Sequence, residues 1–376
     1  MRIAIIGAGP GGLVAARILS LSGVDVTVFE REESFTERSQ GGSLDIHADS
    51  GQIALARAQL TEEFRQIARY EDQESRVYDK HGVLHHCDLD TTGKDRPETD
   101  RGHLRSLLIR SLPSGVIRWG SRVIGATPLG DSWAVNFADG SSESFDMIIG
   151  ADGTWSKIRP QLSDATPAYT GITMIEFGID HVDTRYPAIS AKAGRGLTFA
   201  LGDGKALIAH RDANSHLGGY IGLRDEPDWF QKNGLDTMDP SAARERLCAE
   251  FEGWSTDLLD WIRRSDGPLT PRNIYELPIG HRWQNREGIT LIGDAAHVLS
   301  PFGGDGANLA MLDGAELAEA LLRPEWRTAV IAFEERMCLR ATESSAQSSR
   351  AIQEVFSPDG LDHMLSMMQH RTSHPR

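Results

Sequence analysis

The glycine-rich run GAGPGG at residues 7–12 constrains the fold more than any other feature of the chain. Residues 3–6 before it read as a buried strand, and residues 13–22 after it have the apolar spacing of a helix that stops at Gly23. Residues 24–30 then form a second strand, rich in β-branched side chains. A strand, a glycine turn, a helix and a strand within thirty residues predict the first unit of a doubly wound parallel α/β sheet.

The spacing of these glycines indicates a dinucleotide site. Gly7 allows the tight turn, Gly9 lets the backbone approach a pyrophosphate, and Gly12 lets the helix pack closely on the strand. The helix N-terminus offers unpaired N–H groups and a positive dipole end to the phosphates. Glu30 ends the second strand, where a carboxylate accepts hydrogen bonds from a ribose and repels a 2′-phosphate. The motif therefore favours FAD or NAD over NADP, and a glycine turn without a ligand is the alternative.

A second signal, late in the chain, distinguishes FAD from NAD. Residues 289–292 read as a buried strand that runs into a Gly293-Asp294 turn, and Pro301 precedes a second glycine-rich turn at residues 303–306. A carboxylate at Asp294 can bind the hydroxyls of the ribityl chain, which NAD lacks. The second turn enters a helix whose N–H groups and dipole would stabilise negative charge on a reduced flavin. An ordinary capped helix is the alternative to this interpretation.

A third signal is Asp152-Gly153, directly after a predicted strand at residues 147–149. By itself this pair is equally typical of a simple turn.

The remaining pattern predicts a discontinuous α/β fold. A helix is expected at 101–112, an antiparallel meander at 115–149, separate strands at 172–179, 197–201, 205–210 and 217–223, and helices over 308–322 and much of 328–370. We expect a Rossmann-like FAD-binding domain from residues 1–70, 100–165 and 281–340. Residues 71–99 and 166–280 are expected to form an inserted, mostly antiparallel substrate-binding domain, and residues 341–376 a C-terminal helical segment.

Composition excludes several other functions. A net charge of −15 without a Lys/Arg stripe argues against nucleic-acid binding. Three widely spaced cysteines, Cys87, Cys248 and Cys338, favour neither a disulfide framework nor a metal site, and we expect no bound metal. No apolar stretch reaches the length of a membrane span, and no leader is recognisable at the N-terminus. We therefore expect a cytoplasmic protein that is a monomer.

In this order and spacing, the three motifs resemble those of the group A flavoprotein aromatic hydroxylases, which share the hydroxybenzoate hydroxylase fold. That family has G-x-G-x-x-G near the N-terminus, D-G after a middle strand, and G-D followed by Pro late in the chain. The three motifs together extend over most of this chain, although the residues that match the family are well under half of its length. Within the family, the sequence looks most similar to the tetracycline-inactivating FAD monooxygenases.

Four further segments support that resemblance. Residues 41–52 (GGSLDIHADSGQ) resemble the family's segment beside the flavin, Glu30-Arg31 resembles its pair at the adenosine, and Arg101 maps to an arginine that holds FAD. Residues 355–358 (VFSP) look like the start of the C-terminal helix that bridges the two domains. The family usually has Gln or Glu at the flavin-facing turn, where this chain has Asp305. The expected FAD-binding residues are Gly7, Gly9, Gly12, Glu30, Arg31, Gly42, Arg101, Asp152, Asp294, Pro301, Gly304, Gly306 and Asn308.

The resemblance implies a monooxygenase in which NADPH or NADH reduces FAD, and dioxygen forms a flavin C4a-hydroperoxide that hydroxylates an aromatic or polycyclic small molecule, tetracycline-like compounds included. The flavin does the chemistry, so no catalytic side chain is assigned. Glu176, His210, His216, Tyr220 and Phe302 are candidates for substrate contact, and His297 is expected to be structural. An oxidase or reductase on the same fold, and a non-catalytic flavin-binding protein, remain alternatives. The chain has no second G-x-G-x-x-G and no paired cysteines, which argues against a disulfide reductase. It has no W-x-W-x-I-P segment, which argues against a flavin halogenase.

Overall fold

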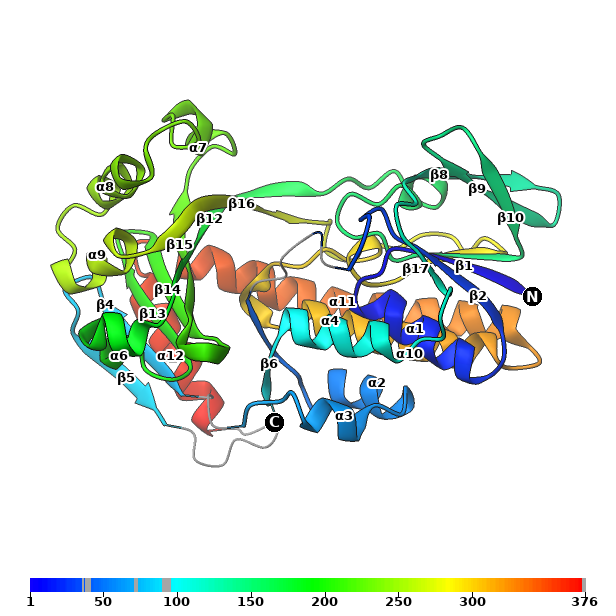
Figure 1. The fold of residues 1–376 in the computed structure, drawn as a ribbon, viewed down its shortest axis with the longest axis horizontal. Coiled ribbons are helices and arrows are strands. Elements are labelled where there is room, and N and C mark those ends of the chain that lie inside the picture. Colours follow the sequence, from blue (N-terminus) through cyan, green and yellow to red (C-terminus); the bar gives the residue numbers. More distant parts are fainter. Residues whose placement is uncertain (36, 38–41, 71–73, 90–95, 374–376) are drawn as a thin grey trace.

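The computed structural model describes residues 1–35, 37, 42–70, 74–89 and 96–373. Gly41, the first residue of the segment expected beside the flavin, lies outside these residues. The chain forms two main sheets connected by long strands and one long helix (Figure 1). Among the described residues, no helix is long and apolar enough to span a membrane.

The first sheet has five parallel strands, as the glycine motif predicts. Both of its faces are covered, so its strands are almost continuously apolar and buried. Its order is β17-β11-β1-β2-β7, with β1 (Arg2–Ile6), β2 (Asp25–Phe29), β7 (Ile117–Arg118), β11 (Met147–Gly150) and β17 (Ile289–Leu291). The antiparallel meander expected at 115–149 is present only in its middle part, as a separate sheet of β8 (Val123–Leu129), β9 (Ser132–Phe137) and β10 (Ser142–Phe145). Its expected first and last strands, β7 and β11, instead pair in parallel with the strands of the first sheet.

Helices α1 (Pro10–Leu21) and α10 (Gly306–Leu321) lie against each other beside this sheet (Figure 1). Their backbones touch because both helices have glycine at the crossing. A Cβ on Gly11 would meet the carbonyl of Ala310, and a Cβ on Gly314 would meet the carbonyl of Gly11. The same domain contains α2 (Gly51–Arg57), α3 (Thr61–Arg65) and α4 (Arg101–Arg110).

The second sheet has seven strands and is antiparallel except for the β13–β4 pair. Its order is β16-β12-β15-β14-β13-β4-β5, with β4 (Ser75–Asp79), β5 (Leu84–Asp88), β12 (Ala168–Ile179), β13 (Leu197–Gly202), β14 (Lys205–Arg211), β15 (Leu217–Arg224) and β16 (Asp266–Glu276). One face packs on α5 (Val182–Arg185), α6 (Pro187–Ala193), α7 (Trp229–Lys232), α8 (Pro240–Glu250) and α9 (Thr256–Arg263). The expected α/β fold with an inserted, mostly antiparallel sheet is confirmed. We call the opposite face of this sheet its inner face.

Helix α11 (Trp326–Val355) joins the two parts of the molecule. Its first half, with Phe333 and Met337, is buried in the core of the parallel sheet. Its end, with Ile352 and Val355, is buried against the inner face of the second sheet. A bridging helix is therefore present, but its predicted start at Val355 is wrong. Val355 is the last residue of α11, which runs unbroken through the boundary expected at 340/341, and α12 (Gly360–Ser373) follows it.

A short antiparallel ribbon of β3 (Ser43–Asp45) and β6 (Glu98–Asp100) lies between the two sheets (Figure 1). Leu44 packs against the first core and Thr99, opposite it, is fully buried. Because side chains alternate along a strand, Ser43, Asp45, Glu98 and Asp100 share the other face of the ribbon.

Candidate active site

Helices α1 and α10, like α2 and α4, begin without a hydrogen bond from a capping side chain. Gly9 is the N-cap of α1 and Asp305 that of α10, and neither makes a side-chain capping bond. Neither first turn contains an acidic residue. A Cβ on Gly9 or on Gly306 would meet no heavy atom within 4 Å. Free N–H groups and two dipole ends thus face open space, which suits an anionic ligand.

Other glycines of the first motif are required by close contacts. Gly7 has φ +107°, and a Cβ there would collide with the carbonyl of Ala151. A Cβ on Gly12 would lie 2.5 Å from the carbonyl oxygen of Gly7 and 3.1 Å from Ile5 Cγ2. Gly7 and Gly12 therefore bring the strand, the helix and the loop after β11 together, while Gly9 leaves space for a ligand.

Glu30 is buried at the end of β2, beside the N-terminus of α1. Its Oε2 accepts a hydrogen bond from Ala8 N at 2.8 Å, and its Oε1 accepts one from Glu32 N at 3.1 Å. Because a carboxylate has about four acceptor positions, Glu30 retains capacity for ribose hydroxyls. Arg31 next to it is exposed.

Arg105 is a site residue that the sequence interpretation missed. It is only 4% exposed, its Nε donates to the carbonyl of Ala8, and its Nη2 lies 2.8 Å from Glu32 Oε2. Its Nη1 has no hydrogen-bond partner among the described residues. An unpaired buried guanidinium N–H beside a phosphate-binding turn fits a phosphate ligand. Arg105 lies on α4 four residues after Arg101, but the resemblance directed attention to Arg101 alone.

Asp294 lies at the end of β17, in the turn that approaches α10. Thr154 Oγ1 donates to its Oδ2 over a long distance of 3.5 Å. Burial raises the pKa of Asp294, and the charges of His297 and Arg101 oppose that shift. A buried acid without a close donor suits a ligand that brings hydroxyl groups.

Asp152 is engaged within its own loop. It accepts bonds from Ser156 Oγ and Lys157 N, both at 2.6 Å. Burial raises the pKa of Asp152, and these bonds oppose that shift. Asp152 therefore stabilises the turn, and the turn places the Thr154 hydroxyl beside the Asp294 carboxylate.

Arg101 begins α4, near the ribbon between the sheets. Its backbone N–H donates to the carbonyl of Gly42 at 3.0 Å. Its charge acts on both Asp294 and Tyr220, so the guanidinium lies between the two domains. Gly42 has φ +88°, and a Cβ there would lie 3.5 Å from the Tyr220 hydroxyl.

Asn308 fixes the second glycine turn to the segment after β3. Its Nδ2 donates to the carbonyls of Asp45 and Gly304, and its Oδ1 accepts from His47 N at 3.0 Å. Gly304 has φ +73°, which the tight turn requires. Pro301 is exposed at the start of a short 3-10 turn, Pro301–Gly303. Asn308 is thus a residue that shapes the turn.

Three of the candidate substrate residues lie together on the inner face of the second sheet. Glu176 and Tyr220 are cross-strand partners, and His210 stacks on Tyr220 with ring centroids 5.9 Å apart. Glu176 accepts from Arg272 Nη2 at 3.0 Å. Phe302 joins the apolar part of the same face through an edge-to-face contact with Phe356. His216 bonds to Asp180 instead and is not part of this group.

The acidic face of the ribbon was also missed. Glu98 accepts a hydrogen bond from Ser43 Oγ, and Arg69 donates to Asp100. The pKa of Glu98 rises to about 7, because it is buried and lies near the Asp45 carboxylate, while Ser43, His210 and Arg69 oppose the shift. A Cβ on Gly42, next to Ser43, would lie 3.5 Å from the Tyr220 hydroxyl, so this end of the ribbon lies beside the inner face of the second sheet.

His297, three residues after Asp294, is buried and pairs with another buried side chain of the first domain. Its Nε2 lies 2.6 Å from Asp313 Oδ2, and Asp313 also accepts from Gly293 N and from Arg340 Nη2. Burial opposes the charged imidazole, but Asp313 outweighs it and raises the pKa of His297. No group of three metal-ligating side chains occurs in the described part of the chain.

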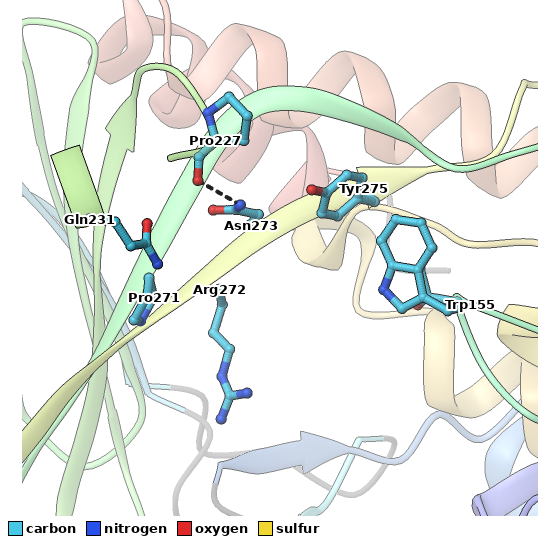
Figure 2. Close-up of a pocket in the computed structure, with 8 residues that line it drawn as sticks. Trp155, Pro227, Gln231, Pro271, Arg272, Asn273 and Tyr275 are labelled. Atoms are coloured by element: carbon cyan, nitrogen blue, oxygen red, sulfur yellow. Dashed lines mark hydrogen bonds between the residues drawn. The ribbon is translucent and has the colours of Figure 1, made fainter. Parts of the chain in front are cut away.

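A cavity of about 320 Å³ opens between the loop that bears Trp155 and strand β16. Figure 2 shows Trp155 and Tyr275 side by side at one end of it, and their ring centroids are 4.9 Å apart. Gln231 and Pro271 lie toward its other end, and Asn273 donates to the carbonyl of Pro227 (Figure 2). Thr154 also lines this cavity, which therefore adjoins Asp294.

A dinucleotide placed across the two helix N-termini would face the inner face of a separate sheet, which is the arrangement of a two-domain flavoprotein. Residues 1–214 and 278–330 match the family model described as FAD binding domain. The match covers more than half of the chain, so the chain belongs to this family and FAD is its cofactor.

Comparisons with individual proteins narrow the class to monooxygenases. The chain is 30% identical to "Monooxygenase asqM" of Emericella nidulans, over 93% of this chain and 87% of that one. HpxO of Klebsiella pneumoniae, solved with FAD and uric acid, has a TM-score of 0.81 at 21% identity, covering 99% and 93% of the two chains. Tetracycline destructase Tet(51) has a TM-score of 0.72 at 19% identity, covering 98% and 96%. The expectation of an FAD-dependent monooxygenase is confirmed.

Proposed function

We propose that this monooxygenase uses NADPH or NADH and dioxygen to hydroxylate an electron-rich aromatic or polycyclic small molecule. The observation that supports this most is that Phe302, just before the α10 N-terminus, packs on the inner face of the sheet that also presents Glu176 and Tyr220. Two structures with the same fold are named for ring compounds, uric acid and tetracycline. Tetracycline-like molecules therefore belong among the candidate substrates.

The residues of the first domain would hold FAD along its length. N–H groups at the start of α1 and the Arg105 guanidinium bind the pyrophosphate, and Glu30 accepts from the adenosine ribose. Asp294 accepts from ribityl hydroxyls, and N–H groups at the start of α10 stabilise negative charge on the reduced ring. When bound, FAD supplies two-electron chemistry that takes hydride from a nicotinamide and transfers one oxygen atom from dioxygen to the substrate.

The residues of the second domain would hold the substrate. Phe302 and the neighbouring apolar side chains pack against a planar ring and exclude water. The Tyr220 hydroxyl makes no hydrogen bond within the described part of the chain, so it can orient a polar group of the substrate. Glu98 can exchange a proton with an ionisable substrate hydroxyl, because its carboxyl changes charge near neutral pH.

The reductant would dock transiently. The cavity beside Trp155 and Tyr275 offers two aromatic side chains to a planar nicotinamide ring, and it adjoins the loop that contacts Asp294. In the balanced reaction, one substrate C–H, one dioxygen, one NAD(P)H and one proton give the hydroxylated product, NAD(P)⁺ and water.

The test is a panel of compounds screened for stimulated NAD(P)H oxidation. We expect slow oxidation without substrate, and a marked increase with an electron-rich phenol or a polycyclic compound such as a tetracycline. The product should be heavier by one oxygen atom. Stimulated oxidation that yields only hydrogen peroxide would support an oxidase instead, and oxygen-independent loss of a double bond would support a reductase.

A further inference from the structure

Asp212 carries a carboxylate that is buried beside the inner face without a close hydrogen-bond donor. It lies in the connection between β14 and β15, its side chain is 13% exposed, and its Oδ1 has no hydrogen-bond partner among the described residues. Its ion-pair neighbour in this part of the chain is His210, whose Nε2 lies 3.4 Å from Oδ1 and is likewise buried without a hydrogen bond. Burying a carboxylate with so little compensation costs stability, which indicates a functional role for the pair.

Gly218 makes room for this pair on the inner face. It is the cross-strand partner of His210 on β14 and of Gly178 on β12. A Cβ on Gly218 would lie 2.6 Å from His210 Nε2 and 2.8 Å from Asp212 Oδ2, so both groups lie directly over the backbone of β15. The imidazole also stacks on Tyr220, two residues further along that strand, with 21° between the ring planes. These contacts fix the plane of the His210 ring.

The two ring nitrogens of His210 have different surroundings. Nε2 lies beside the Asp212 carboxylate, which favours the tautomer that carries its proton on Nε2. In that tautomer Nδ1 has a lone pair and no proton. Nδ1 makes no hydrogen bond within the described part of the chain and, unlike Nε2, it is accessible. His210 therefore presents a hydrogen-bond acceptor that a ligand on the inner face can reach.

Tyr220, stacked on this ring, supplies the complementary donor. Burial raises the pKa of Tyr220, and Glu176 adds to the shift while Arg101 opposes it, so the Tyr220 hydroxyl stays protonated. A hydroxyl group on a ring compound can accept a hydrogen bond from Tyr220 and donate one to His210 at the same time. An ether oxygen can only accept, so it would leave the His210 nitrogen without a partner.

We propose that His210 Nδ1 is the hydrogen-bond acceptor that selects ring substrates with a free hydroxyl group, and that Asp212 is the positioning residue that holds the imidazole proton on Nε2. This inference rests on the proposed binding of the substrate at the inner face. It narrows the substrate class from electron-rich ring compounds in general to phenols and enols, and it predicts that their O-methyl ethers bind poorly.

The test compares two phenols with their methyl ethers, namely phenol with anisole and 2-naphthol with 2-methoxynaphthalene. Dissociation constants are measured from the change in flavin absorbance of the FAD-loaded protein. Wild type should bind at least one phenol about fivefold to tenfold more tightly than its ether, because one hydrogen bond distinguishes them. His210→Phe keeps an aromatic ring over Tyr220 but removes the acceptor, so phenol and ether should then bind equally well.

The ratio of the two affinities separates this role from general damage to the fold, which would weaken phenol and ether alike. Asp212→Asn should lower the ratio, and Asp212→Asn combined with His210→Phe should give the same ratio as His210→Phe alone. His85→Phe is the matched control and should leave the ratio unchanged. His85 pairs with Asp79 at 3.0 Å on the edge strand β5, and β13 and β4 separate that strand from β14.

Equal affinities of wild type for phenol and ether would overturn the inference, as would a His210→Phe protein that keeps the wild-type ratio. An Asp212→Asn protein with the wild-type ratio would overturn the role of Asp212. Phenols that fail to bind, while other ring compounds stimulate NAD(P)H oxidation, would also overturn the inference but leave the proposed function intact. If no ring compound stimulates oxidation, the proposed function fails and this inference fails with it.

Discussion

Among single residues, Glu98 is an acid beside the site whose charge changes near neutral pH. It lies on the ribbon between the domains, where burial and the nearby Asp45 carboxylate raise its pKa from 4.5 to about 7. The folded protein therefore holds this proton more tightly than the unfolded chain does. The stability that the proton contributes is complete below pH 4.5 and is lost as the pH rises through 7.

Glu98→Gln should remove this dependence, because glutamine keeps the shape without titrating. As the pH rises from 5 to 8, we expect the free energy of unfolding of the variant to increase relative to that of wild type, by at most about 3 kcal/mol. Melting temperatures of both proteins across that range measure the difference. A constant difference from pH 5 to pH 8 would show that Glu98 does not titrate with a raised pKa.

Residues with a local role were predictable, and residues defined by distant contacts were not. Gly7, Gly9 and Gly12 lie within one turn, so their spacing alone suggested a ligand-binding motif, although the contacts of Gly7 and Gly12 with Ala151 were not visible in the sequence. Arg105 and Glu98 acquire their roles from partners many residues away in the chain. No local pattern encodes such contacts.

At the scale of elements, the site depends on α1 and α10 lying side by side with both N-termini exposed. Two glycines of the first motif contribute in different ways. Gly12 lies in van der Waals contact with the turn, whereas Gly9 borders open space and has φ −81°, which any residue adopts. Their substitution should therefore affect different properties.

Gly12→Ala should destabilise the fold by about 1–3 kcal/mol, because the new methyl group overlaps the carbonyl of Gly7. Gly9→Ala should leave the melting temperature of the FAD-free protein unchanged but weaken FAD binding about tenfold or more, since the methyl group occupies ligand space. Melting curves and FAD titrations of both variants measure these effects. Equal losses of stability in the two variants would contradict the assignment.

Several helices and strands with a regular hydrophobic pattern were predicted well, but the boundary between the domains was not. Strands β12, β13, β14 and β15 of the second sheet and the helix after the second glycine turn were expected within a few residues of their bounds, whereas β4, β5 and β16 were not expected. The unbroken course of α11 was not, because its sequence continues from one hydrophobic core into another without a change in helical pattern. A boundary between domains leaves no signal within a continuous helix.

In the whole molecule, α11 and the long strands β12 and β16 connect an FAD-binding domain to a sheet that presents a mixed polar and apolar face (Figure 1). The family match establishes FAD and the relatives establish monooxygenase chemistry. The proposed reaction requires that a ring compound occupy the inner face while reduced FAD reacts with dioxygen.

The most direct test of the proposed hydroxylation supplies isotopically labelled dioxygen with NAD(P)H and a compound that stimulates oxidation, and then determines the mass of the product. We predict one labelled oxygen atom in the organic product and the other in water. Label found only in hydrogen peroxide, with the organic compound unchanged, would contradict the hydroxylase assignment.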